Sequence, residues 1–496
     1  MPDYSDPVLS AQSPSASEEP QQESTPKWQI DRRDRLALPL TLLVALLAVQ
    51  VLLYSPALPG LGMTALVLAW YVLRRWHGGK ASFATRSSKL LLVATALLAL
   101  TFALHSNIYL RLLNYLLLFC LIVVQLYEGA PGAGSWGMAS TLVRRAFLLL
   151  EGLFGHLGSL CTLFAKLGKD TKQKRFLAAL AGAGVGLFLL GIILPLLRSA
   201  DVMFASLTDQ AIHWVQINLS GALFRLVLAI ILTPFLFSLL HQLRYPKTQT
   251  GPQETAVKTR VDPTMSIVLL LLLDITFVLF LGTQLAALFG GEDYVSAAGV
   301  SYAEYARSGF FQLVWVALLN LTVIVLCVHL SRHEGRGWKA VQILSTLLVV
   351  LTAVLLVSAC ARMTLYVTVY GLSMKRLFTY WAMAFLGICL LCALRKIFVP
   401  SFGFFRICFS VGVTCWLLFN YVGPDALIAR YNVSAYQSGQ IEWIDTDYLA
   451  TLSYDTLDIL EELPNCQRFV ADRRALAAES ASNWQTWSFS AWRNQD

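Results

Sequence analysis

Long apolar segments recur along most of the chain, and each is close to the length that a helix needs to cross a bilayer. A transmembrane helix takes about 20 predominantly apolar residues. Such segments occupy residues 36–54, 58–73, 89–104, 108–127, 176–197, 222–240, 265–289, 310–330, 340–360, 377–394 and 402–421. The pattern predicts an all-α, polytopic integral membrane helix bundle with about eleven transmembrane helices.

Polar stretches divide the chain around these segments. The N-terminal stretch is rich in Ser, Pro, Gln and Glu, which predicts a disordered tail. The expected organisation is a disordered cytoplasmic tail (1–35), four transmembrane helices (36–127), cytoplasmic amphipathic or interfacial helices (128–175), a seven-helix transmembrane core (176–421) and an extracytoplasmic helical domain with a tail (422–496). In the last region, Leu449, Leu452, Leu457 and Leu460 predict an apolar helical face, and a loose tail is expected from about Ser480.

One further apolar stretch, residues 146–165, would add to the number of transmembrane helices if it crosses the membrane. It contains Glu151 and His156, and basic residues flank it on both sides. A spanning helix would place one of these basic clusters on the side where bases are rare. We therefore predict that it lies in the cytoplasmic interface, with a further transmembrane helix as the alternative.

Composition and charge support the membrane class and predict an orientation. The 496 residues are 56% hydrophobic and 14% charged, whereas soluble domains are about a quarter charged. The net charge of +8 does not require a nucleic-acid partner, because cytoplasmic loops of membrane proteins collect Lys and Arg. The basic loops alternate along the chain, which predicts an N-terminus inside and a C-terminus outside.

Several motifs between the apolar segments form a recognisable set. They are SYAEYARSGF at 301–310, LY at 365–366, YGL at 370–372, RL at 376–377, DALIARYN at 425–432 and DTDYL at 445–449. Their order and spacing resemble a bacterial family of multi-pass membrane proteins, the domain of unknown function 4153/4173 group, over roughly residues 176–460. The segment ADVMF at 200–204 is similar to another segment of this family, which usually has Pro after the Asp; this chain has Val202 there. The resemblance implies a bacterial cytoplasmic-membrane protein and transfers no activity or functional residues.

Asp274 is the main candidate for chemistry within the membrane. It lies inside the apolar segment 265–289, where an ionised carboxylate is costly. We expect it to face the helix bundle, with Arg225 as a candidate partner. Transporters and proton relays use such carboxylates, whereas a structural acid would be neutral or hydrogen-bonded to a neighbouring helix. Arg111, near the end of another segment, is expected to extend toward the headgroups.

A second candidate site is a polar network that the predicted topology places on the outer side. Its members are Glu304, Arg307, Arg362, Tyr366, Tyr370, Arg376 and Arg430. Basic residues at 362–376 are unusual outside and predict an acidic partner there. The C-terminal domain, anionic headgroups and an anionic ligand each satisfy that requirement.

Catalytic signatures are not found in the sequence. It has no phosphate-binding loop, no H-E-x-x-H and no nucleophile elbow. Cys389 and Cys392 form a C-x-x-C inside a predicted helix without a second ligand pair, so no metal, cofactor or catalytic residue is assigned.

We expect a non-enzymatic scaffold or sensor that acts through its outer face. The alternatives are a secondary transporter centred on Asp274 and a membrane enzyme acting on a lipid-linked substrate. The expected partners are membrane lipids and a protein or anionic ligand at the outer face, with no nucleic acid.

Overall fold

The computed structural model confirms an all-α architecture. It describes residues 32–79, 83–128, 140–155, 157, 182, 186, 189–190, 193–201, 203–210, 221–245, 262–289, 310–463 and 466–495. The regular elements of these residues are helices, and none of the described residues forms a β-strand.

Nine helices in the described part of the chain are long and apolar enough to cross a bilayer. They are α1 (Arg32–Leu52), α3 (Arg86–Leu104), α4 (Ile108–Leu126), α9 (Gly221–Arg244), α10 (Pro263–Phe289), α13 (Phe310–Leu330), α14 (Gly335–Tyr370), α15 (Met374–Phe398) and α16 (Phe404–Tyr421). Large apolar side chains such as Leu116, Leu279 and Ile343 remain more than half exposed on them. Exposure of this kind requires an apolar surrounding, so the chain is a multi-pass membrane protein.

These nine helices match nine of the eleven predicted segments. The segment at 58–73 forms α2 (Leu61–Gly78), whose last turns hold Arg74, Arg75 and His77 and leave a short apolar length. The segment at 176–197 lies mostly outside the described residues.

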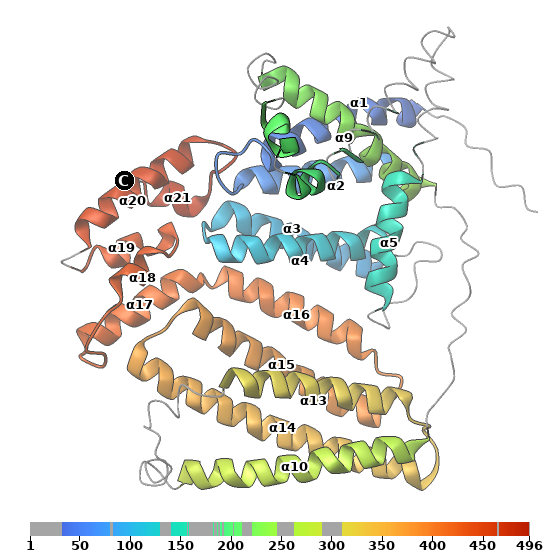
Figure 1. The fold of residues 1–496 in the computed structure, drawn as a ribbon, viewed down its shortest axis with the longest axis vertical. Helices are drawn as coiled ribbons and strands as arrows, with labels where there is room; N and C mark the ends of the chain where they lie inside the picture. The colour runs from blue at the N-terminus through green and yellow to red at the C-terminus, as the bar shows by residue number, and fades with distance from the viewer. Residues whose placement is uncertain are drawn as a thin grey trace, which may run out of the picture.

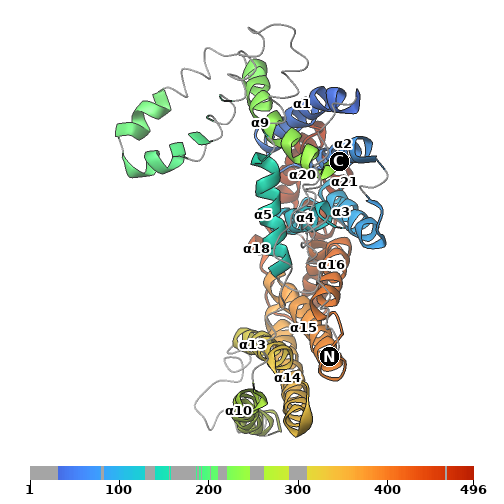
Figure 2. The same cartoon turned by 90° about the vertical axis from the view of Figure 1, so that its right-hand side faces the viewer.

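The membrane helices form a narrow row (Figures 1 and 2). Helices α1 and α9 lie at one edge and α10 lies at the other, with α16 between the N-terminal and C-terminal halves (Figure 1). One buried cluster joins Leu98 and Phe102 of α3 to Val413 and Trp416 of α16, so the halves share an apolar core. Another cluster holds α10, α13, α14 and α15 together.

The C-terminal helices gather along one side of this row, beside one set of helix ends, and we call this side the capped end (Figure 1). They are α17 (Pro424–Gln437), α18 (Thr446–Ala450), the 3-10 helix η2 (Tyr454–Thr456), α19 (Leu457–Leu460), α20 (Gln467–Ser482) and α21 (Phe489–Arg493). The four leucines expected to form an apolar face are all buried, although they do not share one helix: Leu449 is on α18, Leu457 and Leu460 are on α19, and Leu452 lies between these helices.

The expected loose tail after Ser480 is wrong. The backbone N–H groups of Gly60 and Leu61 donate to the carbonyl oxygens of Gln485 and Trp487, both at 2.8 Å. The Gln485 side chain donates to the Gln50 carbonyl at 2.6 Å. The turn between α1 and α2 has backbone groups without partners in its own helices, and the C-terminal segment supplies those partners.

Helix α14 is longer than its predicted span of 340–360. Its 36 residues correspond to about 54 Å, well beyond the ~30 Å hydrocarbon core. The residues after 360, which were expected to form a loop, therefore continue α14 toward the C-terminal helices. By contrast, α5 (Ser140–Phe154), from the predicted interfacial stretch, runs across the other helices at the end opposite the cap (Figure 1).

Candidate functional site: a groove at the capped end

The groove begins at the tight turn between α14 and α15. Gly371 has a φ of +73°, a conformation that favours glycine, and a Cβ there would overlap Oδ1 of Asn432. Asn432 lies on α17, and its side chain binds the backbone of the next residue, Leu372. The turn is therefore positioned by α17 as well as by its own two helices.

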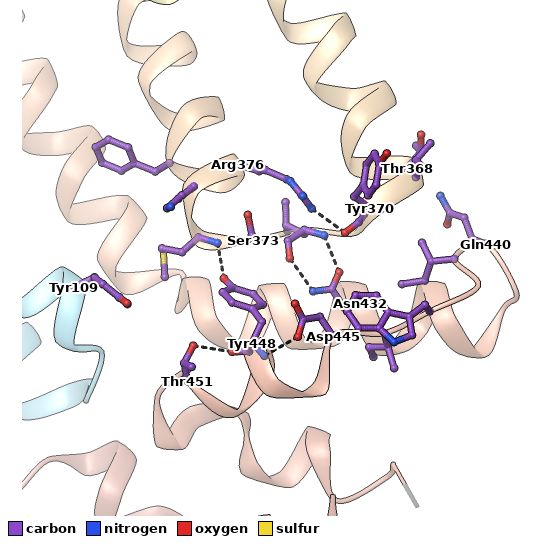
Figure 3. Close-up of a pocket in the computed structure, with 18 of the residues that line it drawn as sticks. Tyr109, Thr368, Tyr370, Ser373, Arg376, Asn432, Gln440, Asp445, Tyr448 and Thr451 are labelled. Atoms are coloured by element: carbon purple, nitrogen blue, oxygen red, sulfur yellow. Dashed lines mark hydrogen bonds between the residues drawn. The ribbon is translucent and has the colours of Figure 1, made fainter. Parts of the chain in front are cut away.

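A cavity of about 1140 Å³ lies between this turn, the start of α4, and the C-terminal helices. We call it the capped-end groove. Figure 3 shows Arg376 and Tyr370 on the side of α14 and α15, with Asp445 and Tyr448 facing them from the C-terminal segment. Its volume is slightly above the roughly 300–1,000 Å³ that is typical of small-molecule sites.

One wall of the groove is basic. Arg376 donates to the carbonyl oxygens of Tyr370, at 2.8 Å, and of Gly371. Its guanidinium lies 4.3 Å from the ring centroid of Tyr366, a cation–π contact. Lys375 is exposed beside it, and its side-chain ammonium has no hydrogen-bond or ion-pair partner among the described residues. Arg376 is thus held in place, whereas the Lys375 ammonium remains available.

The facing wall carries acids and aromatic rings. Asp445 accepts a hydrogen bond from the backbone N–H of Tyr448 at 2.8 Å and so caps α18. The Tyr448 hydroxyl accepts from the backbone N–H of Met374 at 2.7 Å, and burial raises the pKa of this phenol. Glu442 is exposed without a partner in the described chain, and the neighbouring Trp443 is 73% exposed. Among the described residues of the groove, the Lys375 ammonium and the Glu442 carboxylate are therefore the charged groups without a partner.

Three residues of the predicted outer-side network meet beside this groove. The rings of Tyr366 and Tyr370 lie one helical turn apart with centroids 4.9 Å from each other, and Arg376 stacks against Tyr366. Arg362 is buried one turn earlier on α14, and Arg430 is exposed on α17. Glu304 and Arg307 lie outside the described residues.

Sequence reasoning did not single out Tyr109, Asn432, Glu442, Trp443 or Tyr448 as site residues. Tyr448 and Asn432 fall within two of the quoted motifs, DTDYL and DALIARYN, which was the available signal. Nothing in the spacing of Tyr109, more than 300 residues earlier, indicated that it lines the same groove.

The C-terminal helices are attached by a buried acid that was not singled out as a site residue, although it opens the DALIARYN motif. Asp425 is 2% exposed, and its two carboxylate oxygens accept from the Asn107 amide, both at 2.7 Å. The backbone N–H of Ser453 also donates to Asp425, at 3.0 Å. Burial raises the pKa of Asp425 despite these donors. The capped end is thus fixed to the start of α4 beside the groove.

Arg111 does not extend to the headgroups as expected. It is 7% exposed, and its guanidinium donates to the carbonyl oxygens of Leu58, Phe102 and His105 at 2.8–3.1 Å. These include carbonyls at the C-terminal end of α3, which lack partners within the helix. The rigid fork of five donors in Arg suits such a cluster of acceptors.

Asp274 faces the helix bundle as expected, but Arg225 is not its partner. The Asp274 side chain is 2% exposed, and neither carboxylate oxygen has a hydrogen-bond partner in the described chain. Arg225 instead donates to Gln50 at 2.9 Å and lies over the Tyr54 ring. The two residues do not meet because α9, which carries Arg225, and α10, which carries Asp274, lie at opposite edges of the row (Figure 1).

A second buried acid, Asp34, was also missed. It is fully buried at the end opposite the cap, 3.0 Å from Nε2 of His77 and 3.1 Å from Arg244. It therefore joins the ends of α1, α2 and α9. Within the described ranges, no three His, Cys, Asp or Glu side chains are grouped so that they would hold a metal ion.

Comparison with known proteins identifies a family. A family model described as a domain of unknown function, DUF4153, matches residues 92–463. No curated protein and no solved structure matches the chain.

Proposed function

Because the chain belongs to the DUF4153 family, whose description states no activity, we propose its function from the geometry of the capped-end groove. The protein is a non-enzymatic scaffold or sensor of the bacterial cytoplasmic membrane that acts through this end, which faces outward. The observation that carries the proposal is the groove itself. Four separate parts of the chain converge on it, and it presents a free ammonium, a free carboxylate and exposed aromatic rings.

The distribution of bases supports the proposed orientation. Arg74, Arg145 and Arg244 lie at the end opposite the cap, where they contact Gln125, Glu128 and Asp34 respectively. Bases of membrane proteins accumulate on the cytoplasmic side. The capped end then lies outside, together with the groove and the C-terminus.

A transporter is the second candidate, and one observation favours it. Buried oxygen atoms without hydrogen-bond partners in the described chain occur on three helices of one packed cluster: Asp274 on α10, Asn320 Oδ1 on α13 and Ser345 Oγ on α14. Oxygen ligands of this kind suit a proton or a hard cation. Such atoms would carry function within the membrane instead of at its surface.

Complementation of a deletion strain distinguishes the two candidates. The double variant Lys375→Gln/Glu442→Gln is expected not to correct an envelope defect of the deletion strain that the wild-type protein corrects, whereas Asp274→Asn is expected to correct it. Arg336→Gln, an exposed change at the opposite end, is the matched control. All variants are compared at equal membrane levels. Failure of Asp274→Asn together with success of the double variant would overturn the scaffold or sensor assignment in favour of transport.

A further inference from the structure

We propose that the capped-end groove binds one zwitterionic phospholipid that carries a primary ammonium, with the lipid phosphate at Lys375 and the ammonium at Glu442. This inference rests on the proposed function, because it names the ligand of the same groove. Three features of the groove carry it: an apolar floor open to the bilayer, a balanced set of charges and exposed interfacial aromatic rings.

The floor of the groove belongs to the membrane-facing surface. Leu113 on α4 is 43% exposed and Phe378 on α15 is 37% exposed, and both line the cavity. Each lies about one turn inside the capped-end terminus of its helix, or roughly 6–8 Å along the axis. A lipid in the adjacent leaflet can therefore keep its acyl chains against these residues while its headgroup occupies the polar part.

The charges of the groove favour a zwitterion over an anion. The charged residues of the lining are Lys375, Arg376, Glu442 and Asp445, so their formal charges cancel. Arg376 and Asp445 already hydrogen-bond to the protein backbone. Lys375 and Glu442 remain without described partners and come from different walls. An ammonium donor for the phosphate and a carboxylate acceptor for the amine match the two charges of one headgroup.

The aromatic lining places the groove at the headgroup level. Tyr109, Tyr370 and Trp443 are each more than half exposed. Tyr and Trp prefer the interface, where the ring is apolar and its polar atom remains hydrated. Trp443 follows Glu442 in the sequence, and the face of a Trp ring attracts a cation. A primary ammonium can donate hydrogen bonds to Glu442 as well, which a quaternary ammonium cannot.

Lipid titration of the purified full-length protein in detergent tests this assignment. Phosphatidylethanolamine, phosphatidylcholine and phosphatidylglycerol with identical acyl chains are compared by native mass spectrometry and by thermal shift. Wild type is expected to bind phosphatidylethanolamine about tenfold more tightly than either of the others, the difference that one charge-assisted hydrogen bond provides.

Two single variants test the phosphate contact and the ammonium contact of the headgroup separately. Lys375→Gln is expected to weaken all three lipids, because each has a phosphate. Glu442→Gln is expected to abolish the preference for phosphatidylethanolamine over phosphatidylglycerol while retaining binding. Arg336→Gln, at the opposite end, is the control and is expected to bind as wild type does. Both groove residues are exposed, so neither change removes a buried contact.

The lipid titration also has results that would contradict the proposal. Equal wild-type affinity for phosphatidylethanolamine and phosphatidylglycerol overturns the proposal, as does a preference that survives Glu442→Gln. Free phosphoethanolamine is added as a competitor, and displacement at concentrations comparable to the lipid would assign the groove to a soluble ligand instead. If the groove double variant fails in cells while the purified wild type shows no lipid preference, the proposed function stands and the lipid assignment fails.

Discussion

The amide of Asn432 pairs with both backbone polar groups of Leu372. Its Oδ1 accepts from the Leu372 N–H at 2.7 Å, and its Nδ2 donates to the Leu372 carbonyl at 2.8 Å. Both residues are buried. One side chain of α17 therefore replaces the backbone pairing that the turn between α14 and α15 lacks, and it sets the position of the basic wall of the groove.

Asn432→Ala is expected to lower the free energy of unfolding by about 2 kcal/mol or more, because it leaves two buried backbone groups unpaired. Thermal unfolding in detergent measures the loss, and lipid binding to the groove should weaken with it. Gln437→Ala, an exposed change on the same helix, is the control and should have little effect. Equal stability of the two variants would show that the pairing contributes nothing.

Asp425 is expected to make stability depend on pH. Burial raises its pKa above the ordinary 3.8, so the native state binds this proton more tightly than the unfolded chain. Its stabilising contribution is then complete below pH 3.8 and is lost as pH rises through the higher native pKa. Wild type should lose stability relative to Asp425→Asn across that window, and the difference should be constant above it.

The measurement for Asp425 is thermal unfolding at a series of pH values. The exposed Asp447→Asn provides the control for acids outside the buried contact. Wild-type and Asp425→Asn curves that stay parallel from pH 3.5 to 7 would contradict the expected role of burial.

Asp274→Leu is expected to raise the free energy of unfolding by about 1–3 kcal/mol, because it removes a buried carboxyl group that has no partner in the described chain. Leu270→Ala, one turn earlier at a fully buried position, should instead cost about 2–5 kcal/mol. Both are measured by denaturation in detergent. A loss of stability in Asp274→Leu would mean that an ion, water or other group binds the carboxylate in the native protein.

Orientation in the membrane is best tested at exposed positions, because Cys466 is only 5% exposed and Cys161 lies outside the described residues. In a cysteine-free background, Ser438→Cys should react with an impermeant thiol reagent in intact cells. Arg336→Cys should react only after the membrane is opened. The reverse pattern would place the capped end in the cytoplasm.

The membrane class and most of the helices followed from the sequence alone. A bilayer imposes one requirement on every crossing segment, about 20 apolar residues in a helix, and that requirement is local. The same reasoning placed Asp274 inside the bundle, because an acid facing lipid is too costly. It also grouped Tyr366, Tyr370 and Arg376, which lie close together along the chain.

Only the tertiary structure decided which distant polar groups meet. Asp425 pairs with Asn107 across 318 positions, and Asp34 pairs with Arg244 across 210. The apolar segment 340–360 did not indicate that α14 continues to Tyr370. The C-terminal helices that pack near the end of α14 come later in the chain. The groove arises in the same way, from walls contributed by four separate parts of the chain. Hydrogen bonds and ion pairs have short range, so their partners depend on how the helices pack, whereas the apolar length of each helix depends only on its own residues.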